Sequence, residues 1–270
     1  MFRLELPRGR PVPLVLEIPH AGTVLPVEVR DKLAAAPSAV QRDADAYVDE
    51  LFAGASARGA TVLVSELSRY VVDLNRNETD VDGETVTGAP ATQGSHPRGV
   101  VWRETAEGQP SLRRPLTRVE FEDRLARYYR PYHRALEAEI LQLREAFGCV
   151  VLLAAHSMPS RDRGSVYGQE QRADVVPGTR GRTTASAKLI DLVDAHFRDA
   201  GLVVRHDDPY KGGYTTQHYG RPKEGFHAIQ IELSRGLYMD EETGEPRRTG
   251  FASLTALLDS LVLKLAAAAP

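Results

Sequence analysis

Short apolar runs that alternate with helical segments constrain the fold of this chain most strongly. Four runs have the length of buried β-strands, and they cover residues 13–18, 60–64, 149–154 and 227–233. Four other segments have the pattern of helices, and they cover residues 42–57, 121–147, 184–200 and 251–268. This alternation predicts an α/β fold with a mostly parallel sheet covered by helices on both faces.

Proline and irregular stretches interrupt this pattern. Pro131 lies within the helical segment 121–147 and predicts a kink or break at Arg130, because proline removes one main-chain hydrogen bond. Residues 77–115 and 157–182 are rich in Gly, Thr, Pro or Arg and predict long irregular segments. Such segments in a compact domain are usually functional or disordered.

Size and charge favour a soluble protein with a small-molecule ligand. The 270 residues are 42% hydrophobic and carry a net charge of −3, so we expect one domain, 1–270, that binds neither nucleic acid nor anionic membrane. Cys149 is the only cysteine, which excludes an intrachain disulfide and suits the cytoplasm. No apolar run approaches the roughly 20 residues that span a bilayer. The oligomeric state stays open.

Two histidines follow predicted strands, where ligands bind in open α/β sheets. They are His20, after the run 13–18, and His156, after the run 149–154, and the acidic pair Asp43 and Asp45 lies between them in the chain. Two imidazoles and one carboxylate form the ligand set of a catalytic zinc ion. Taken singly, each histidine is more often packed than metal-bound, and an acid at a helix start also complements the helix dipole. Taken together, they favour a metal site.

Polar residues in two further blocks match an anionic ligand. In SRYVVDLNR, residues 68–76, a guanidinium beside an amide offers donors to a carboxylate, although Arg69 and Asp73 would equally form a surface ion pair. In KGGYTTQHYG, residues 211–220, paired glycines allow a loop that wraps a small polar ligand, and a hairpin turn is the simpler alternative.

Glu232 lies within the apolar run 227–233. Burial disfavours the charged carboxylate, so the pKa of Glu232 would rise, as a general base requires. The alternatives are a salt bridge to Arg235 or an exposed strand face. Glu232 is therefore the candidate catalytic residue.

The order of these blocks along the chain, from about residue 14 to 240, resembles the N-formylglutamate amidohydrolase family, the deformylases of histidine degradation. The resemblance implies a three-layer α/β/α fold with a mixed, mostly parallel sheet, similar to zinc carboxypeptidases. It also implies one zinc ion per chain and hydrolysis of N-formyl-L-glutamate to formate and L-glutamate.

The resemblance also implies roles for single residues. PHAG and AAHS are similar to the family's histidine blocks, which makes His20 and His156 zinc ligands, and DADAYV makes Asp45 the third ligand, with Asp43 as the fallback. Glu232 would be the general base. The substrate-binding residues would be Arg69, Asn75, Arg76, Lys211, Gly213, Tyr214 and His218.

Three departures from the family pattern leave the acyl group of the substrate open. Ala46 and Tyr47 replace an aromatic–histidine pair, Ala154 and Ala155 stand where the family has an acid near the second histidine, and residues 87–102 match unevenly. A zinc carboxypeptidase and an N-acyl amino acid deacylase are therefore alternatives. So is a small-molecule binding protein that lost catalysis.

Overall fold

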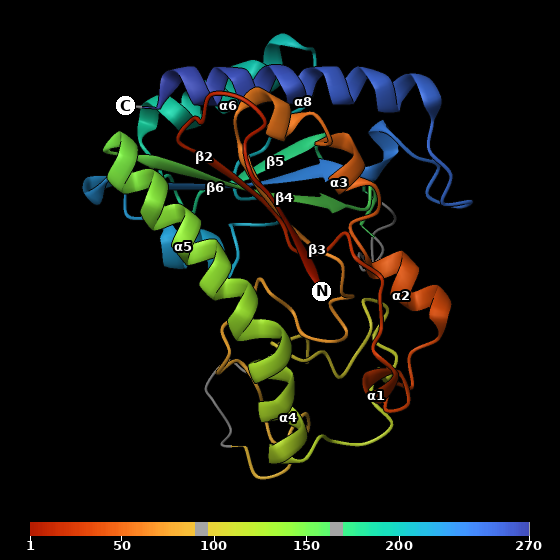
Figure 1. Ribbon diagram of the computed structural model, residues 1–270. Helices are drawn as coiled ribbons and strands as arrows, with labels where there is room; N and C mark the ends of the chain where they lie inside the picture. Colours follow the sequence, from red (N-terminus) through yellow and green to blue (C-terminus); the bar gives the residue numbers. More distant parts are fainter. Residues whose placement is uncertain (90–96, 163–169, 270) are drawn as a thin grey trace. The chain divides into compact units, whose positions relative to one another are not determined.

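The strands form one mixed β-sheet (Figure 1). The computed structural model describes residues 1–89, 97–162 and 170–269. The strand order within these residues is β1-β3-β2-β4-β6-β5. The strands are β1 (Phe2–Glu5), β2 (Leu14–Ile18), β3 (Thr61–Ser65), β4 (Val150–Met158), β5 (Val175–Gly178) and β6 (Phe226–Ser234). The predicted α/β fold is confirmed.

Helices and helical turns connect these strands. The α-helices are α1 (Val27–Arg30), α2 (Pro37–Asp43), α3 (Val48–Leu51), α4 (Arg118–Arg124), α5 (Arg130–Phe147), α6 (Ala187–Asp199), α7 (Tyr214–Tyr219) and α8 (Arg248–Ala268). Short turns are η1 (Ala55–Arg58), η2 (Leu125–Tyr129), η3 (Pro222–Glu224) and η4 (Arg235–Leu237).

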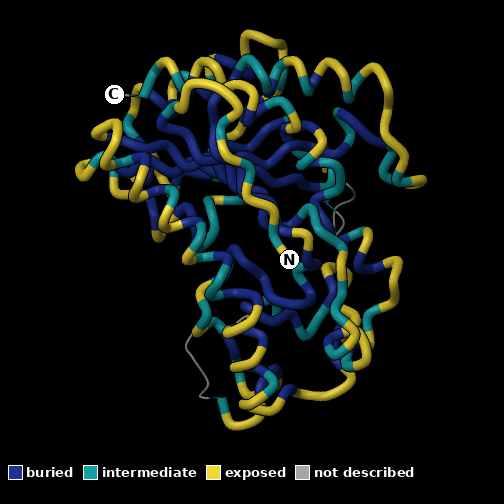
Figure 2. Tube along the Cα trace, in the orientation of Figure 1, coloured by how far each residue is buried: buried dark blue, intermediate teal, exposed yellow. Residues whose placement is uncertain are grey.

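The strands β2, β4 and β6 run parallel, and β5 pairs antiparallel with β6. Every residue of these four strands is buried, as the dark tube in Figure 2 shows. Strands covered on both faces are apolar throughout, so a polar side chain within them is exceptional. The register places His156 of β4 opposite Glu232 of β6. Two of the predicted site residues are therefore neighbours in the sheet.

Contacts divide the chain into two compact units. The first unit comprises residues 1–3, 19–46 and 64–138, and the second comprises residues 4–18, 47–63 and 139–270. The first unit contains α1, α2 and α4, and the second contains the parallel strands with α6, α7 and α8. The single domain 1–270 stays a prediction.

Helix α8 packs along the second unit's sheet, next to α6 (Figure 1). Its buried side chains form one stripe, as its periodicity predicts: Leu254, Leu258, Leu261, Val262 and Leu265. Within the described residues, α8 is the helix long and apolar enough to cross a membrane by length and composition, which the sequence analysis did not anticipate. It contacts α6 and β2 along its buried stripe, and 28% of its apolar stretch is buried.

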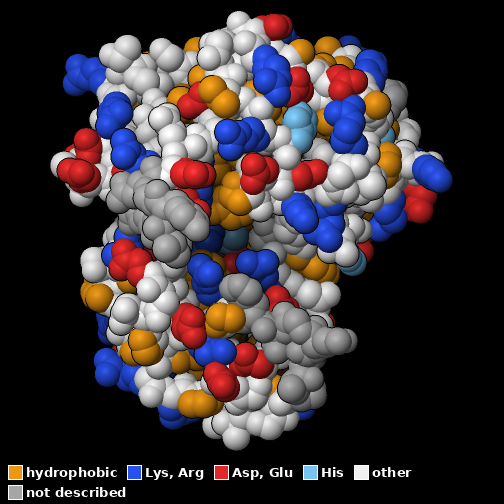
Figure 3. Space-filling view, turned by 180° about the vertical axis from the view of Figure 1, so that it is seen from behind, with side chains coloured by type: hydrophobic (Ala, Val, Ile, Leu, Met, Phe, Trp, Pro, Cys, Tyr) orange, Lys and Arg blue, Asp and Glu red, His pale blue; other side chains and the backbone are white. Residues whose placement is uncertain are grey.

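Charged side chains of both signs intermix on the face shown in Figure 3. Cys149, just before β4, is buried, as its apolar surroundings predict. Burial raises the pKa of its thiol. A protonated thiol is a poor nucleophile.

The predicted helix 42–57 is wrong. Helix α2 ends at Asp43, Ala44 is extended, and Tyr47 adopts a left-handed conformation with φ of 64° before the short helix α3 begins. The amide of Asp45 donates to the carbonyl of His20 at 2.9 Å, a pairing that a continuous helix would exclude. This tertiary contact outweighs helix propensity.

Other boundaries also differ from the predictions. Strand β4 continues to Met158, so His156 lies within the strand and not after it. Strand β5 lies in the stretch 157–182 that was predicted to be irregular. The helix does not break at Arg130, because the π turn η2 precedes Pro131, whose ring would crowd the carbonyl of residue 127 in a regular α-helix.

Candidate active site

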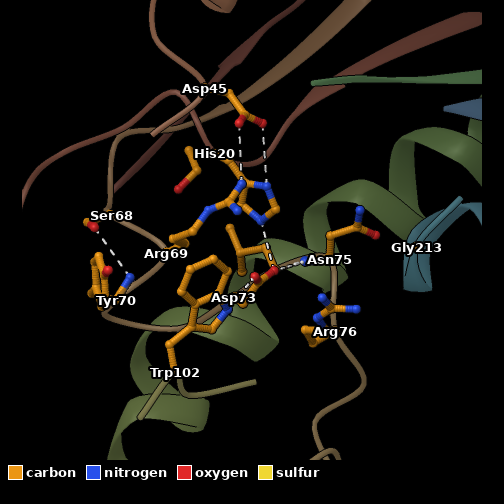
Figure 4. A network of polar contacts seen from close by, with 12 residues as sticks. His20, Asp45, Ser68, Arg69, Tyr70, Asp73, Asn75, Arg76, Trp102 and Gly213 are labelled. Carbon is orange, nitrogen blue, oxygen red and sulfur yellow. Dashed lines mark hydrogen bonds and ion pairs between the residues drawn. The ribbon is translucent and has the colours of Figure 1, made fainter. Parts of the chain in front are cut away.

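His20 lies just after β2, between two carboxylates of the first unit (Figure 4). Its Nε2 is 2.8 Å from Asp73 Oδ1, and its Nδ1 is 3.6 Å from Asp45 Oδ2. Burial and Arg69 lower the pKa of His20, but Asp73 and Asp45 outweigh them, so the pKa is raised. In the neutral ring, Nε2 carries the proton and donates it in a hydrogen bond to Asp73. The lone pair of Nδ1 then points towards Asp45.

Asp45 and Asp43 occupy different environments although they are two residues apart. Asp45 is buried, and its Oδ1 lies 3.4 Å from the Nη2 of Arg69. Asp43 accepts hydrogen bonds from the hydroxyl of Tyr70 and from the amide of Ala106. The structure therefore places Asp45 beside His20, and it places Asp43 in a hydrogen-bond network of its own.

Asp73 is a buried residue beside His20 that the sequence pattern did not assign to the site. Besides His20, it accepts hydrogen bonds from the Trp102 indole at 2.9 Å and from the Asn75 amide at 2.9 Å (Figure 4). Burial raises the pKa of Asp73, but the facing His20, Arg69 and Arg76 lower it well below its usual range. The surface ion pair proposed for Asp73 is therefore wrong. Its position in the block SRYVVDLNR was the available signal.

Two cationic side chains of the block 68–76 differ in their contacts. Arg69 is half-buried, pairs with Asp45 and lies over the Trp102 ring at 4.9 Å. The Nε of Arg76 is buried and has no hydrogen-bond partner among the described residues. A buried donor of this kind is costly unless a ligand satisfies it. Arg76, next to the buried Asn75, thus offers a donor to an anion.

In the second unit, Glu232 belongs to a hydrogen-bonded chain. The amide of Gly213 donates to Gln230 Oε1 at 2.8 Å, and Gln230 Nε2 donates to Glu232 Oε1 at 2.8 Å. Gln230 and Glu232 are two residues apart in β6, so their side chains lie on the same face. Glu232 is only 6% exposed, so the exposed strand face is wrong. Arg235 donates to Ser157 Oγ at 3.1 Å.

The block 211–220 forms a glycine turn followed by helix α7, and not a hairpin. Gly212 has φ of +97°, a conformation that other residues rarely adopt. Lys211 and His218 are exposed, and Tyr214 stacks on His218 with ring centroids 5.0 Å apart. The turn thus presents Lys211 to solvent and directs the Gly213 amide to Gln230.

The chain is similar to solved proteins over nearly its whole length. The crystal structure of N-formylglutamate amidohydrolase from Ralstonia eutropha JMP134 superposes with a TM-score of 0.91 at 35% identity and covers 99% of this chain and 98% of that one. A gene product of Agrobacterium tumefaciens, at 19% identity and a TM-score of 0.72, shares the fold. With the relatives below, these findings define the class: the chain is a hydrolase that acts on an amide.

The family follows from the sequence comparisons. A family model described as N-formylglutamate amidohydrolase matches residues 12–239. N-formylglutamate deformylase from Pseudomonas aeruginosa is 33% identical over 268 residues, which is 96% of each chain, and that from Pseudomonas putida is 33% identical over 88% of this chain and 85% of its own. The chain belongs to the N-formylglutamate amidohydrolase family, which confirms the predicted resemblance.

Proposed function

We propose that this protein hydrolyses the formamide bond of N-formyl-L-glutamate, or of a closely related N-acyl amino acid, to a carboxylic acid and the free amino acid. The two Pseudomonas relatives are named for deformylation of N-formylglutamate. The observation that carries the proposal is the buried His20, whose Nδ1 faces Asp45 while Asp73 binds its Nε2. This is the arrangement of a metal-binding histidine with an orienting carboxylate.

His20, Asp45 and His156 would hold one Zn²⁺. All three are buried, and two imidazoles with a carboxylate are the donor set of catalytic zinc sites. The contacts of His20 support the fit of these residues to a metal ion. Asp73 fixes the proton on Nε2 of His20 and leaves Nδ1 to bind a cation. When bound, zinc supplies Lewis acidity, which polarises a carbonyl and lowers the pKa of water towards about 7.

Glu232 would act as the general base. Its carboxylate would take a proton from the attacking water and then pass it to the nitrogen of the leaving amine. The hydrogen bond from Gln230 holds Oε1 of this carboxylate. A fixed carboxylate needs little reorganisation during the reaction.

The anionic part of the substrate would be held by donors from both blocks. Asn75 and Arg76 would bind one carboxylate, since Arg76 has a buried donor without a partner in the described chain. The second carboxylate of a dianionic substrate would meet Arg69 or Lys211. The turn that carries Lys211 would contribute the remaining contacts, from Gly213, Tyr214 and His218.

Formate release with and without a chelator tests this function. Purified protein should contain about one zinc per chain by elemental analysis and should release formate from N-formyl-L-glutamate. A chelator should abolish turnover, and added zinc should restore it. N-acetylglutamate and a dipeptide with a C-terminal glutamate serve as comparison substrates. Turnover that is unchanged by the chelator would contradict the proposed metal requirement. Faster turnover of a comparison substrate would contradict the proposal that the substrate carries a formyl group.

A further inference from the structure

The helix between residues 118 and 147 contains one π turn, which determines which side chains face the block 68–76. Helix α4 leads into the π turn η2 (Leu125–Tyr129), and α5 follows directly. Residues four apart share one face of an α-helix. A π turn holds one additional residue, so two residues five apart across it align as a pair four apart does. Arg124, Tyr129 and His133 therefore line one face.

Arg124 is the first of these three side chains. It is only 3% exposed, and its Nη1 donates to the carbonyls of Tyr70 at 3.2 Å and Val71 at 3.1 Å. Burial lowers the pKa of its guanidinium to about 10. Removing a guanidinium from water costs free energy, and its hydrogen bonds to these two carbonyls offset part of that cost.

Tyr129 and His133 continue the same row of contacts. The hydroxyl of Tyr129 donates to the carbonyl of Arg76 at 2.7 Å. The Nε2 of His133 lies 3.1 Å from the carbonyl of Leu74, and because a carbonyl only accepts, this nitrogen carries the proton. The two rings also pack together, with centroids 4.2 Å apart. The row thus reaches from the start of the segment 70–76 to its end.

The segment 70–76 contains no helix or strand, so its backbone carbonyls need other partners. The three helical side chains supply partners to the carbonyls of residues 70, 71, 74 and 76. The same segment carries Asp73, Asn75 and Arg76. The helix face formed by Arg124, Tyr129 and His133 therefore holds the backbone conformation that orients these side chains.

We propose that Arg124, Tyr129 and His133 are positioning residues for substrate capture. They touch no reacting atom and act through the backbone of residues 70–76, which sets the direction of Asn75 and Arg76. This proposal rests on the proposed function, in which Asn75 and Arg76 bind a substrate carboxylate.

Two neighbouring tyrosines provide a matched test. Tyr129→Phe removes the hydroxyl that donates to Arg76, whereas Tyr128→Phe removes a hydroxyl of the same π turn that donates to Glu28 at 2.6 Å, outside the segment. Loss of one hydrogen bond changes an equilibrium by about three- to tenfold. Tyr129→Phe should therefore raise KM for N-formyl-L-glutamate about three- to tenfold with kcat within about twofold of wild type, and Tyr128→Phe should leave both unchanged.

Amide hydrogen exchange of peptides that cover residues 70–76 gives a readout independent of turnover. Exchange should be faster in Tyr129→Phe than in Tyr128→Phe. Unchanged exchange overturns the proposal, and so does an equal change of KM in both variants. If the wild-type protein releases no formate, the proposed function fails, and the exchange measurement alone then decides: faster exchange in Tyr129→Phe upholds the positioning role, and equal exchange overturns it.

Discussion

Two carboxylates contact His20, and their distances assign them different roles. The 2.8 Å contact with Asp73 is a hydrogen bond, and the 3.6 Å contact with Asp45 is longer than one. Asp73 also accepts from Trp102 and from a main-chain amide, so its ionised form is stabilised by three donors. Asp73 is therefore suited to orienting the ring, and Asp45 to sharing a cation with it.

Replacing Asp73 by Asn should weaken zinc binding about 10- to 100-fold, because partners that orient a ligating histidine contribute that much to metal affinity. Competition with a chromophoric chelator measures the affinity. Asp123→Asn is the control, since Asp123 is an exposed residue of α4 that pairs with the exposed Arg127 of η2. Equal zinc affinity in both variants would show that Asp73 does not orient a ligand.

Replacing Glu232 by Gln should lower kcat about 10²- to 10⁴-fold, which is the usual contribution of a general base. Bound zinc should stay near one equivalent, since Glu232 is not among the proposed ligands. The exposed Glu224, substituted in the same way, is the control. Steady-state formate release together with elemental analysis separates the two effects, and a fully active Glu232→Gln enzyme would exclude the general-base role.

At the scale of single elements, the sequence predicts those strands and helices whose position depends on the local hydrophobic pattern. The run 13–18 became β2 with nearly the same bounds, and the stripe of leucines in α8 is buried as predicted. The prediction of one helix over residues 42–57 failed because the main-chain hydrogen bond between Asp45 and His20 joins residues that are remote in sequence. Asp73 was missed for the same reason, since 53 residues separate it from His20.

The π turn shows a further limit of periodicity. A repeat of three and four residues over 121–147 predicts one helical stripe and gives no sign of an additional residue. Pro131 marked the correct region, where the helix contains a π turn and does not break. The sequence could have predicted Gln230 as a neighbour of Glu232, because residues two apart in a strand lie on the same face.

At the scale of the whole molecule, buried histidines couple stability to pH. His227 is 4% exposed at the start of β6, and its Nδ1 accepts the amide of Ser186 at 3.2 Å. Burial lowers the pKa of His227 below its usual 6.5. The unfolded chain therefore binds a proton in a pH range where the folded chain does not. Stability from this residue is present above pH 6.5 and is lost as the pH falls below that value.

His227→Gln should therefore reduce the loss of stability on acidification, because glutamine retains an acceptor for Ser186 but does not titrate. Urea unfolding of both proteins at pH 7 and pH 5 measures the free energy of unfolding. The wild-type protein should lose more of this free energy between the two pH values than the variant does. Equal losses would show that His227 is protonated alike in the folded and unfolded chains.

The buried Cys149 makes this chain a convenient background for site-directed labelling. It is the sole thiol of the protein, and its burial and raised pKa shield it from alkylating reagents. A cysteine introduced on the exposed side of α7, for example, would take up a fluorophore or spin label selectively in the otherwise native molecule. Ligand-dependent movements of the neighbouring glycine turn then become open to spectroscopy.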